Sequence, residues 1–169
     1  MDSSSDKLPR HLLIAFLLAL AVYGLFFSCD MALRKRKGPW QVEFHTNAAG
    51  HAAITVNQPA LQITNVQIVF INEIATNSGP VIFDRPQQPI PFGKIKFEDL
   101  TYLPGSVAFD FFGHELELLP RTLYLNKQEH PWQPNEVFQL TPAQKLPPGA
   151  SYDPRKKKRS FRPQSSSTN

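Results

Sequence analysis

Residues 40–56 read WQVEFHTNAAGHAAITV, and this stretch decides the fold class. Apolar residues occupy alternate positions on both sides of the segment NAAG at 47–50. These alternating residues are Trp40, Val42, Phe44, Ala52, Ile54 and Val56. A period of two is typical of a half-buried strand, and Asn and Gly between two such runs favour a turn. The stretch therefore predicts a β-hairpin.

The same period recurs along the chain as far as Leu125, with proline, glycine and asparagine between the runs. Near Thr64 and Asn65 the apolar residues change from odd to even positions, which we interpret as one extra residue in a β-bulge. No segment of this body has a helical period. We therefore expect an all-β domain over residues 38–140, built as an antiparallel β-sandwich or small barrel of seven to eight strands. The sequence does not separate sandwich from barrel.

The N-terminal side of this body has a different composition. Residues 12–29, LLIAFLLALAVYGLFFSC, form an uncharged run behind a short polar tail. As a helix this run would be about 27 Å long, just under the hydrocarbon thickness of about 30 Å. Extending the helix to Leu33 supplies the difference. We assign residues 1–37 to a polar tail, a transmembrane anchor helix at 12–33 and a basic stop at Arg34–Lys37.

Two other interpretations of the apolar run compete with a permanent anchor. One is a cleaved secretory signal, which usually has a shorter apolar core and a small-residue cleavage site. The other is a bacterial lipoprotein signal in which Cys29, preceded by Ser28, is acylated. Cys29 is therefore the candidate lipidation site. It is the single cysteine of the chain, so no intramolecular disulfide forms.

The charges beside the apolar run predict its orientation in the membrane. Four consecutive cations at Arg34–Lys37 follow the run, whereas only Lys7, Arg10 and the amino terminus precede it. The positive-inside rule then favours a single-pass protein with its domain on the cytoplasmic side. Short N-terminal tails of this kind often stay inside, however, which makes the extracytoplasmic side the alternative.

Charge is distributed unevenly along the chain. Residues 38–140 carry five cations and ten acids, a net charge of −5, although the whole chain has a net charge of +4. Residues 141–169 are rich in proline, basic residues and serine, a composition that predicts a disordered tail. The candidate residues for binding an anionic surface are Arg34, Lys35, Arg36, Lys37, Arg155, Lys156, Lys157, Lys158, Arg159 and Arg162. Anionic lipid or another protein is the expected partner, and nucleic acid is the less favoured one.

Candidate catalytic chemistry is sparse. The segment HELEL at 114–118 has Leu118 where a zinc-protease helix needs its second histidine, so we expect Glu115 and Glu117 to form a solvated acidic face. Motifs for nucleophile elbows, phosphate loops, dinucleotide binding and C-x-x-C chemistry do not occur. Two further sets of side chains are the carboxylates Glu98, Asp99 and Asp110, which neighbouring strands could bring together, and the histidines His45 and His51, which could face each other across the first turn. We interpret the first as ordinary acids at strand ends and the second as an exposed pair near a hairpin.

None of these sets supports the assignment of a catalytic residue, a cofactor or a metal. The sequence favours a membrane-anchored β-domain with a binding or scaffolding role. One alternative is a binder of lipid surfaces or nucleic acid acting through the basic tail. The other is an enzyme with a carboxylate or histidine site on the sheet.

Overall fold

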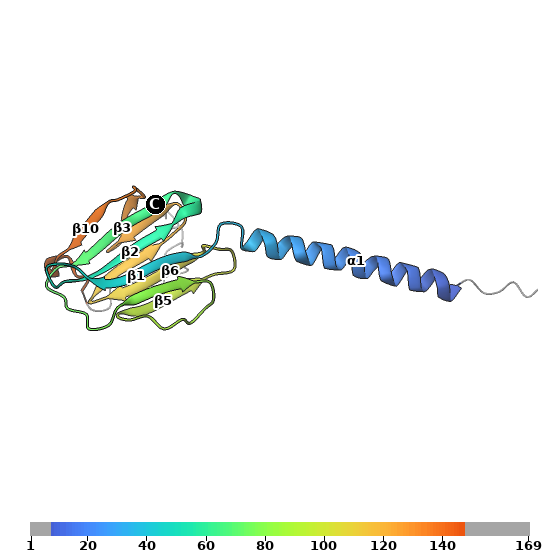
Figure 1. The fold of residues 1–169 in the computed structure, drawn as a ribbon, viewed down its shortest axis with the longest axis horizontal. Helices are drawn as coiled ribbons and strands as arrows, with labels where there is room; N and C mark the ends of the chain where they lie inside the picture. The colour runs from blue at the N-terminus through green and yellow to red at the C-terminus, as the bar shows by residue number, and fades with distance from the viewer. Residues whose placement is uncertain (1–7, 148–169) are drawn as a thin grey trace, which may run out of the picture.

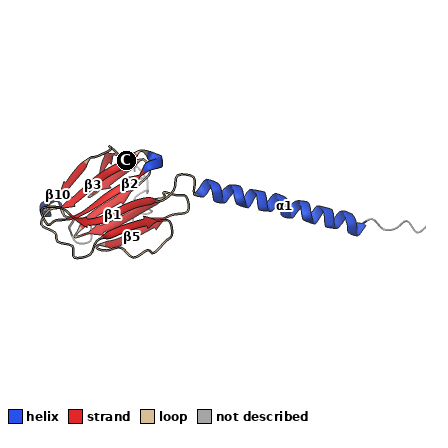
Figure 2. Ribbon diagram, in the orientation of Figure 1, coloured by secondary structure: helices blue, strands red, loops and turns tan. Residues whose placement is uncertain are grey.

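The computed structural model describes residues 8–147 and has one long helix followed by a β-rich domain (Figure 1). The helix, α1, is Leu8–Arg34, which includes the expected anchor segment and begins earlier. The remainder forms two five-stranded sheets joined by loops and two short 3₁₀ turns (Figure 2). The prediction of one N-terminal apolar helix and a β-rich body is confirmed.

The first sheet has the strand order β10-β3-β2-β1-β4. Its strands are β1 (Trp40–Thr46), β2 (Ala52–Gln58), β3 (Ile63–Phe70), β4 (Gly79–Phe83) and β10 (Val137–Leu140). The second sheet has the order β5-β6-β7-β8-β9. Its strands are β5 (Lys94–Asp99), β6 (Ser106–Phe111), β7 (His114–Leu118), β8 (Thr122–Leu125) and β9 (Gln128–Pro131).

Ten strands correct the prediction of seven to eight, and one pairing corrects the prediction of a wholly antiparallel domain. The missed strands are β9 and β10, each of four residues. The sequence of β9, QEHP, shows no alternation because the strand lies at a sheet edge with most of its residues exposed. β10 pairs with β3 in parallel, with Phe138 opposite Ile68.

The hairpin of residues 40–57 forms as predicted, with Phe44 opposite Ile54. The predicted bulge also forms. Val56 lies opposite Val66 and Gln58 lies opposite Ile63, so β3 has one more residue than β2 over this interval. Asn65 adopts a left-handed conformation with φ 53° there, which asparagine tolerates better than most residues.

Side chains from both sheets form one hydrophobic core. Phe111 of β6 lies 6.0 Å from Phe44 of β1 and 5.2 Å from Phe70 of β3, measured between ring centroids. Phe83 of β4 contacts Phe109 of β6 edge to face at 5.4 Å. Each fully buried side chain of this size contributes on the order of 1.5–3 kcal/mol. The aromatic contacts thus join the two sheets into one domain without a disulfide.

The strands run toward or away from α1, so the loops lie at two ends of the domain (Figure 1). We call the end that contacts α1 the helix-proximal end. The first turn, at 47–50, lies at the other end of β1, which we call the distal end.

The described fold continues beyond Leu140 into the 3₁₀ turn η2 (Pro142–Gln144). Leu146 N donates to Gly113 O at 3.0 Å, which fastens this segment to the β6–β7 turn. The first part of the segment predicted as a disordered tail is therefore attached to the domain.

Candidate functional site

The first functional feature is the surface of α1. Its span Pro9–Arg34 has 26 residues, and none of them in the most apolar window is buried inside the protein. Such a helix is about 39 Å long, enough to cross a hydrocarbon layer of about 30 Å. Cys29, the lipidation candidate, lies on this helix with its thiol exposed. Length and composition thus make α1 capable of spanning a membrane.

The end of α1 is attached to the domain rather than joined by an open linker. Arg34 Nε donates to Asp30 Oδ2 at 2.7 Å, a pairing of side chains one helical turn apart. The guanidinium of Arg34 also lies 5.0 Å from the ring centroid of Tyr102. Leu103 N donates to the carbonyl of Arg34 at 2.7 Å. The β5–β6 loop therefore closes over the carboxyl end of α1.

A second set of contacts fixes the connection between α1 and β1. Gln58 Nε2 donates to the carbonyls of Gly38 at 2.9 Å and Pro39 at 2.8 Å. Trp40, fully buried, donates from Nε1 to Gly105 O at 3.1 Å. Gly105 has φ 69°, and a Cβ built there would lie 2.1 Å from Asp99 O. Only glycine fits this position.

The structure places four of the ten basic candidates at this junction. Arg34 ends α1, and Lys35–Lys37 form the exposed turn that follows. Among residues 8–147 the three ion pairs involve Arg34, Lys96 and Lys145, so Lys35–Lys37 make none. The remaining candidates lie outside the described residues: Arg155, Lys156, Lys157, Lys158, Arg159 and Arg162.

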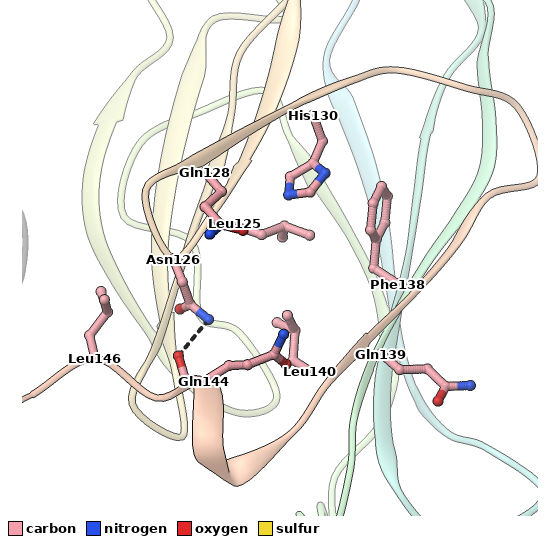
Figure 3. A pocket seen from close by; sticks show the side chains of 9 residues that line it. All are labelled: Leu125, Asn126, Gln128, His130, Phe138, Gln139, Leu140, Gln144 and Leu146. Atoms are coloured by element: carbon pink, nitrogen blue, oxygen red, sulfur yellow. Dashed lines mark hydrogen bonds between the residues drawn. The ribbon is translucent and has the colours of Figure 1, made fainter.

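A pocket of about 280 Å³ opens between the edge strands β9 and β10 (Figure 3). Leu125, Phe138 and Leu140 supply apolar walls. The ring of His130 contacts that of Phe138 at 5.0 Å between centroids. Side-chain amide groups also line the pocket, among them that of Gln128, and they can form hydrogen bonds with a polar ligand. Sequence reasoning missed this pocket, because most of the residues that line it lie beyond Leu125, where no strand was predicted.

Asn126 joins the pocket to the buried histidine of β7. Its Nδ2 donates to Gln144 O at 2.9 Å and lies 3.0 Å from His114 Nδ1. Its Oδ1 accepts from Glu115 N at 3.0 Å. Burial, followed by the nearby charge of Lys145, lowers the pKa of His114 below its ordinary value of 6.5. His114 is therefore a neutral core residue whose Nε2 has no hydrogen-bond partner among the described residues.

The three carboxylates Glu98, Asp99 and Asp110, considered above as a possible site, do not converge. Asp99 lies opposite Ser106, whereas Asp110 lies opposite Lys94 at the other end of the β5–β6 pair. Each side chain has a local role: Asp110 pairs with Lys96 at 3.6 Å, Asp99 Oδ1 accepts from Thr101 N at 3.0 Å, and Glu98 accepts from Gln87 N. Strand register therefore places Asp99 and Asp110 at opposite ends of the β5–β6 pair.

The two histidines of the first turn do not lie directly opposite each other. His45 lies opposite Ala53 in the hairpin, and the ring of His51 instead accepts from Asn72 N at 3.2 Å. The prediction that Glu115 and Glu117 form a solvated acidic face was wrong for Glu115, which is buried. Glu117 is half-buried. Within residues 8–147, no cluster of three or more histidine, cysteine or acidic side chains could hold a metal ion.

Comparison with known proteins returned no match: no family model, no curated protein and no solved structure is similar to this chain.

Proposed function

We propose that this chain is a single-pass membrane protein in which α1 anchors a β-sandwich domain that binds a partner at the membrane. The observation that carries the proposal is the combination of an apolar, unburied α1 with the bonds from Leu103 and Gln58 to its carboxyl end. An anchor on a long, open linker would let the domain tumble. A bonded junction instead gives the domain one orientation at the membrane surface.

A sandwich is favoured over a barrel by the topology of the two sheets. Each sheet has two edge strands, β10 and β4 in one and β5 and β9 in the other, and no pairing joins one sheet to the other among the described strands. Closure of a barrel requires such a pairing. Side chains of both sheets nevertheless share one core, as the inner faces of a sandwich do.

The binding role rests on the pocket of about 280 Å³ between β9 and β10, which combines apolar walls with amide groups. Its chemistry suits recognition rather than bond cleavage, because Asn126 is already engaged by three partners and His130 packs against Phe138. No described residue there combines a nucleophile with a hydrogen-bonded base.

The side of the membrane is part of the proposal. Lys35–Lys37 immediately follow α1, and cations at this position favour the cytoplasmic side. Protease protection on intact cells and on spheroplasts, with an epitope after Asn169, tests this assignment. The expected result is an epitope protected in both preparations and digested after lysis. Digestion in spheroplasts would place the domain outside.

The mass of the same material tests the fate of the N-terminus. A retained anchor gives a chain that begins at Met1 or the following residue. A mass that corresponds to a chain starting at an acylated Cys29 would instead establish the lipoprotein interpretation. The mature protein would then lack most of α1.

The second candidate function is binding to anionic lipid or nucleic acid through the basic tail. The charge of residues 155–162 supports it, and each cation near an anionic membrane surface contributes about 1 kcal/mol. Deletion of residues 154–163 should then weaken salt-sensitive binding to anionic vesicles more than binding to DNA. Unchanged binding to both would end this hypothesis.

A further inference from the structure

We infer that the helix-proximal end of the domain itself docks on anionic phospholipid headgroups of the membrane leaflet from which α1 emerges. The inference rests on the proposed anchoring and extends it from α1 to a surface of the β-domain. We define the docking surface by the exposed residues Lys35, Arg36, Lys37, Arg85, Tyr102 and Arg121.

Three separate segments bring these residues to one end of the domain. Lys35–Lys37 directly follow α1. Arg85 lies two residues beyond Phe83, which pairs with Trp40 at the start of β1. These two segments therefore adjoin the point where the chain leaves the helix.

Arg121 reaches the same end through the β7–β8 turn. This turn is closed by Leu119 and Thr122, whose backbone groups bond each other at 3.1 and 3.3 Å. Trp132 Nε1 donates to Leu119 O at 2.9 Å, and the Trp132 ring lies 5.5 Å from that of Trp40. Because Trp40 begins β1, the contact between the two tryptophan rings places Arg121 beside the junction.

The depth of this surface is set by α1. If the apolar helix fills the hydrocarbon layer up to Leu33, Arg34 and the β5–β6 loop that contacts it lie at the headgroup level. Tyr102 of that loop is 56% exposed. Tyrosine is enriched at membrane interfaces because its ring is apolar and its hydroxyl is polar. The loop thus has the composition of an interfacial contact.

The charge of this surface complements an anionic leaflet. None of its five cations forms one of the ion pairs among residues 8–147. Two acids at this end, Asp84 and Asp99, accept hydrogen bonds from the neutral groups Gln88 Nε2 at 2.7 Å and Thr101 N at 3.0 Å and keep their negative charge, so the five cations outnumber them. The domain as a whole is acidic, so electrostatic repulsion from anionic lipid favours this end facing the bilayer and the distal end facing away.

The test uses full-length protein reconstituted in vesicles, with a fluorophore at one engineered cysteine in a Cys29→Ser background. Thr101→Cys labels the helix-proximal end, and Ala48→Cys labels the distal turn, both at exposed positions. A spin-labelled headgroup lipid is the quencher. Vesicles contain either phosphatidylcholine alone or phosphatidylcholine with phosphatidylglycerol at 7:3.

If the domain docks, the fluorophore should be quenched strongly at position 101 and weakly at position 48. The difference in quenching between the two positions should be larger in the anionic vesicles than in phosphatidylcholine alone. In those vesicles the double variant Arg85→Gln/Arg121→Gln should reduce the ratio of docked to undocked protein about fivefold for each arginine removed. The matched variant Lys94→Gln/Lys127→Gln removes the same charge from the distal end and should leave quenching unchanged.

Equal quenching at positions 101 and 48, quenching indifferent to phosphatidylglycerol, or equal behaviour of the two double variants would overturn the docking surface. In each of these cases the protein still floats with the vesicles. A failure of α1 to anchor is distinct, because the protein then separates from the vesicles and neither position is quenched.

Discussion

Gln58→Met tests the attachment of α1 to the domain. Gln58 is 1% exposed, and its amide group donates to the carbonyls of Gly38 and Pro39. Methionine has nearly the same length and volume but neither donor nor acceptor, so the substitution removes these two bonds, and the bond that Oε1 accepts from Ala60 N at 3.0 Å, without opening a cavity. Ala60 is exposed, so water can replace its lost acceptor. The packing of β2 against the core stays the same.

The expected loss follows from the two carbonyls. Gly38 and Pro39 are half-buried, so water replaces the lost donors only in part. An unsatisfied, partly buried carbonyl costs about 1 kcal/mol at the lower end of the usual range. The free energy of unfolding should therefore fall by about 2 kcal/mol, which lowers Tm by about 8 °C for a domain of this size.

Urea unfolding of the full chain in micelles, followed by the fluorescence of the contacting tryptophans Trp40 and Trp132, measures this loss. Gln41→Met is the matched control, because Gln41 is exposed on the neighbouring strand β1. It should change the free energy by less than about 0.5 kcal/mol. Equal midpoints for the two variants, at an unchanged slope, would show that the Gln58 bonds do not stabilise the junction.

Three further substitutions and conditions test the domain. Gly105→Ala should destabilise it by more than about 2 kcal/mol, because φ is positive and the new Cβ would meet Asp99 O. Thermal unfolding measures this loss. Gly50→Ala is the milder control, because a Cβ at this turn would meet no other atom. Phe109→Ala should cost about 3–5 kcal/mol in urea unfolding, since this fully buried ring contacts residues of both sheets. Because the pKa of His114 is lowered by burial, the unfolded chain binds the proton more readily, so stability is full above about pH 6.5 and falls as the pH drops below it. His114→Asn should flatten this part of the profile of unfolding free energy against pH. An unchanged profile would contradict the assignment of this pH dependence to His114.

The predictable features of this fold are those encoded locally. Alternation within residues 40–56 identifies the hairpin, and the change of phase near Asn65 locates the bulge. The strands β9 and β10 escaped prediction because each has four residues and is stabilised by a neighbouring strand rather than by its own pattern. The parallel pairing of β10 with β3 joins segments about 70 residues apart, which no local period reveals.

The junction could be predicted only in part. The apolar run and the cations after it indicate an anchor, but the donors that hold its end come from Gln58 and Leu103, far along the chain. A polar residue at the end of a strand carries no signal of such a partner. The separation of Asp99 from Asp110 was unpredictable for the same reason, since strand register sets which acidic side chains can meet.

Alkaline carbonate extraction followed by flotation shows whether α1 holds the domain in a membrane. We expect the native chain to stay with the floated membranes. Leu18→Lys/Val22→Lys should release it, because each charge near the middle of a span costs about 2.5–3.5 kcal/mol. Release of the native chain into the alkaline supernatant, at the same level as this variant, would show that α1 is not a membrane anchor.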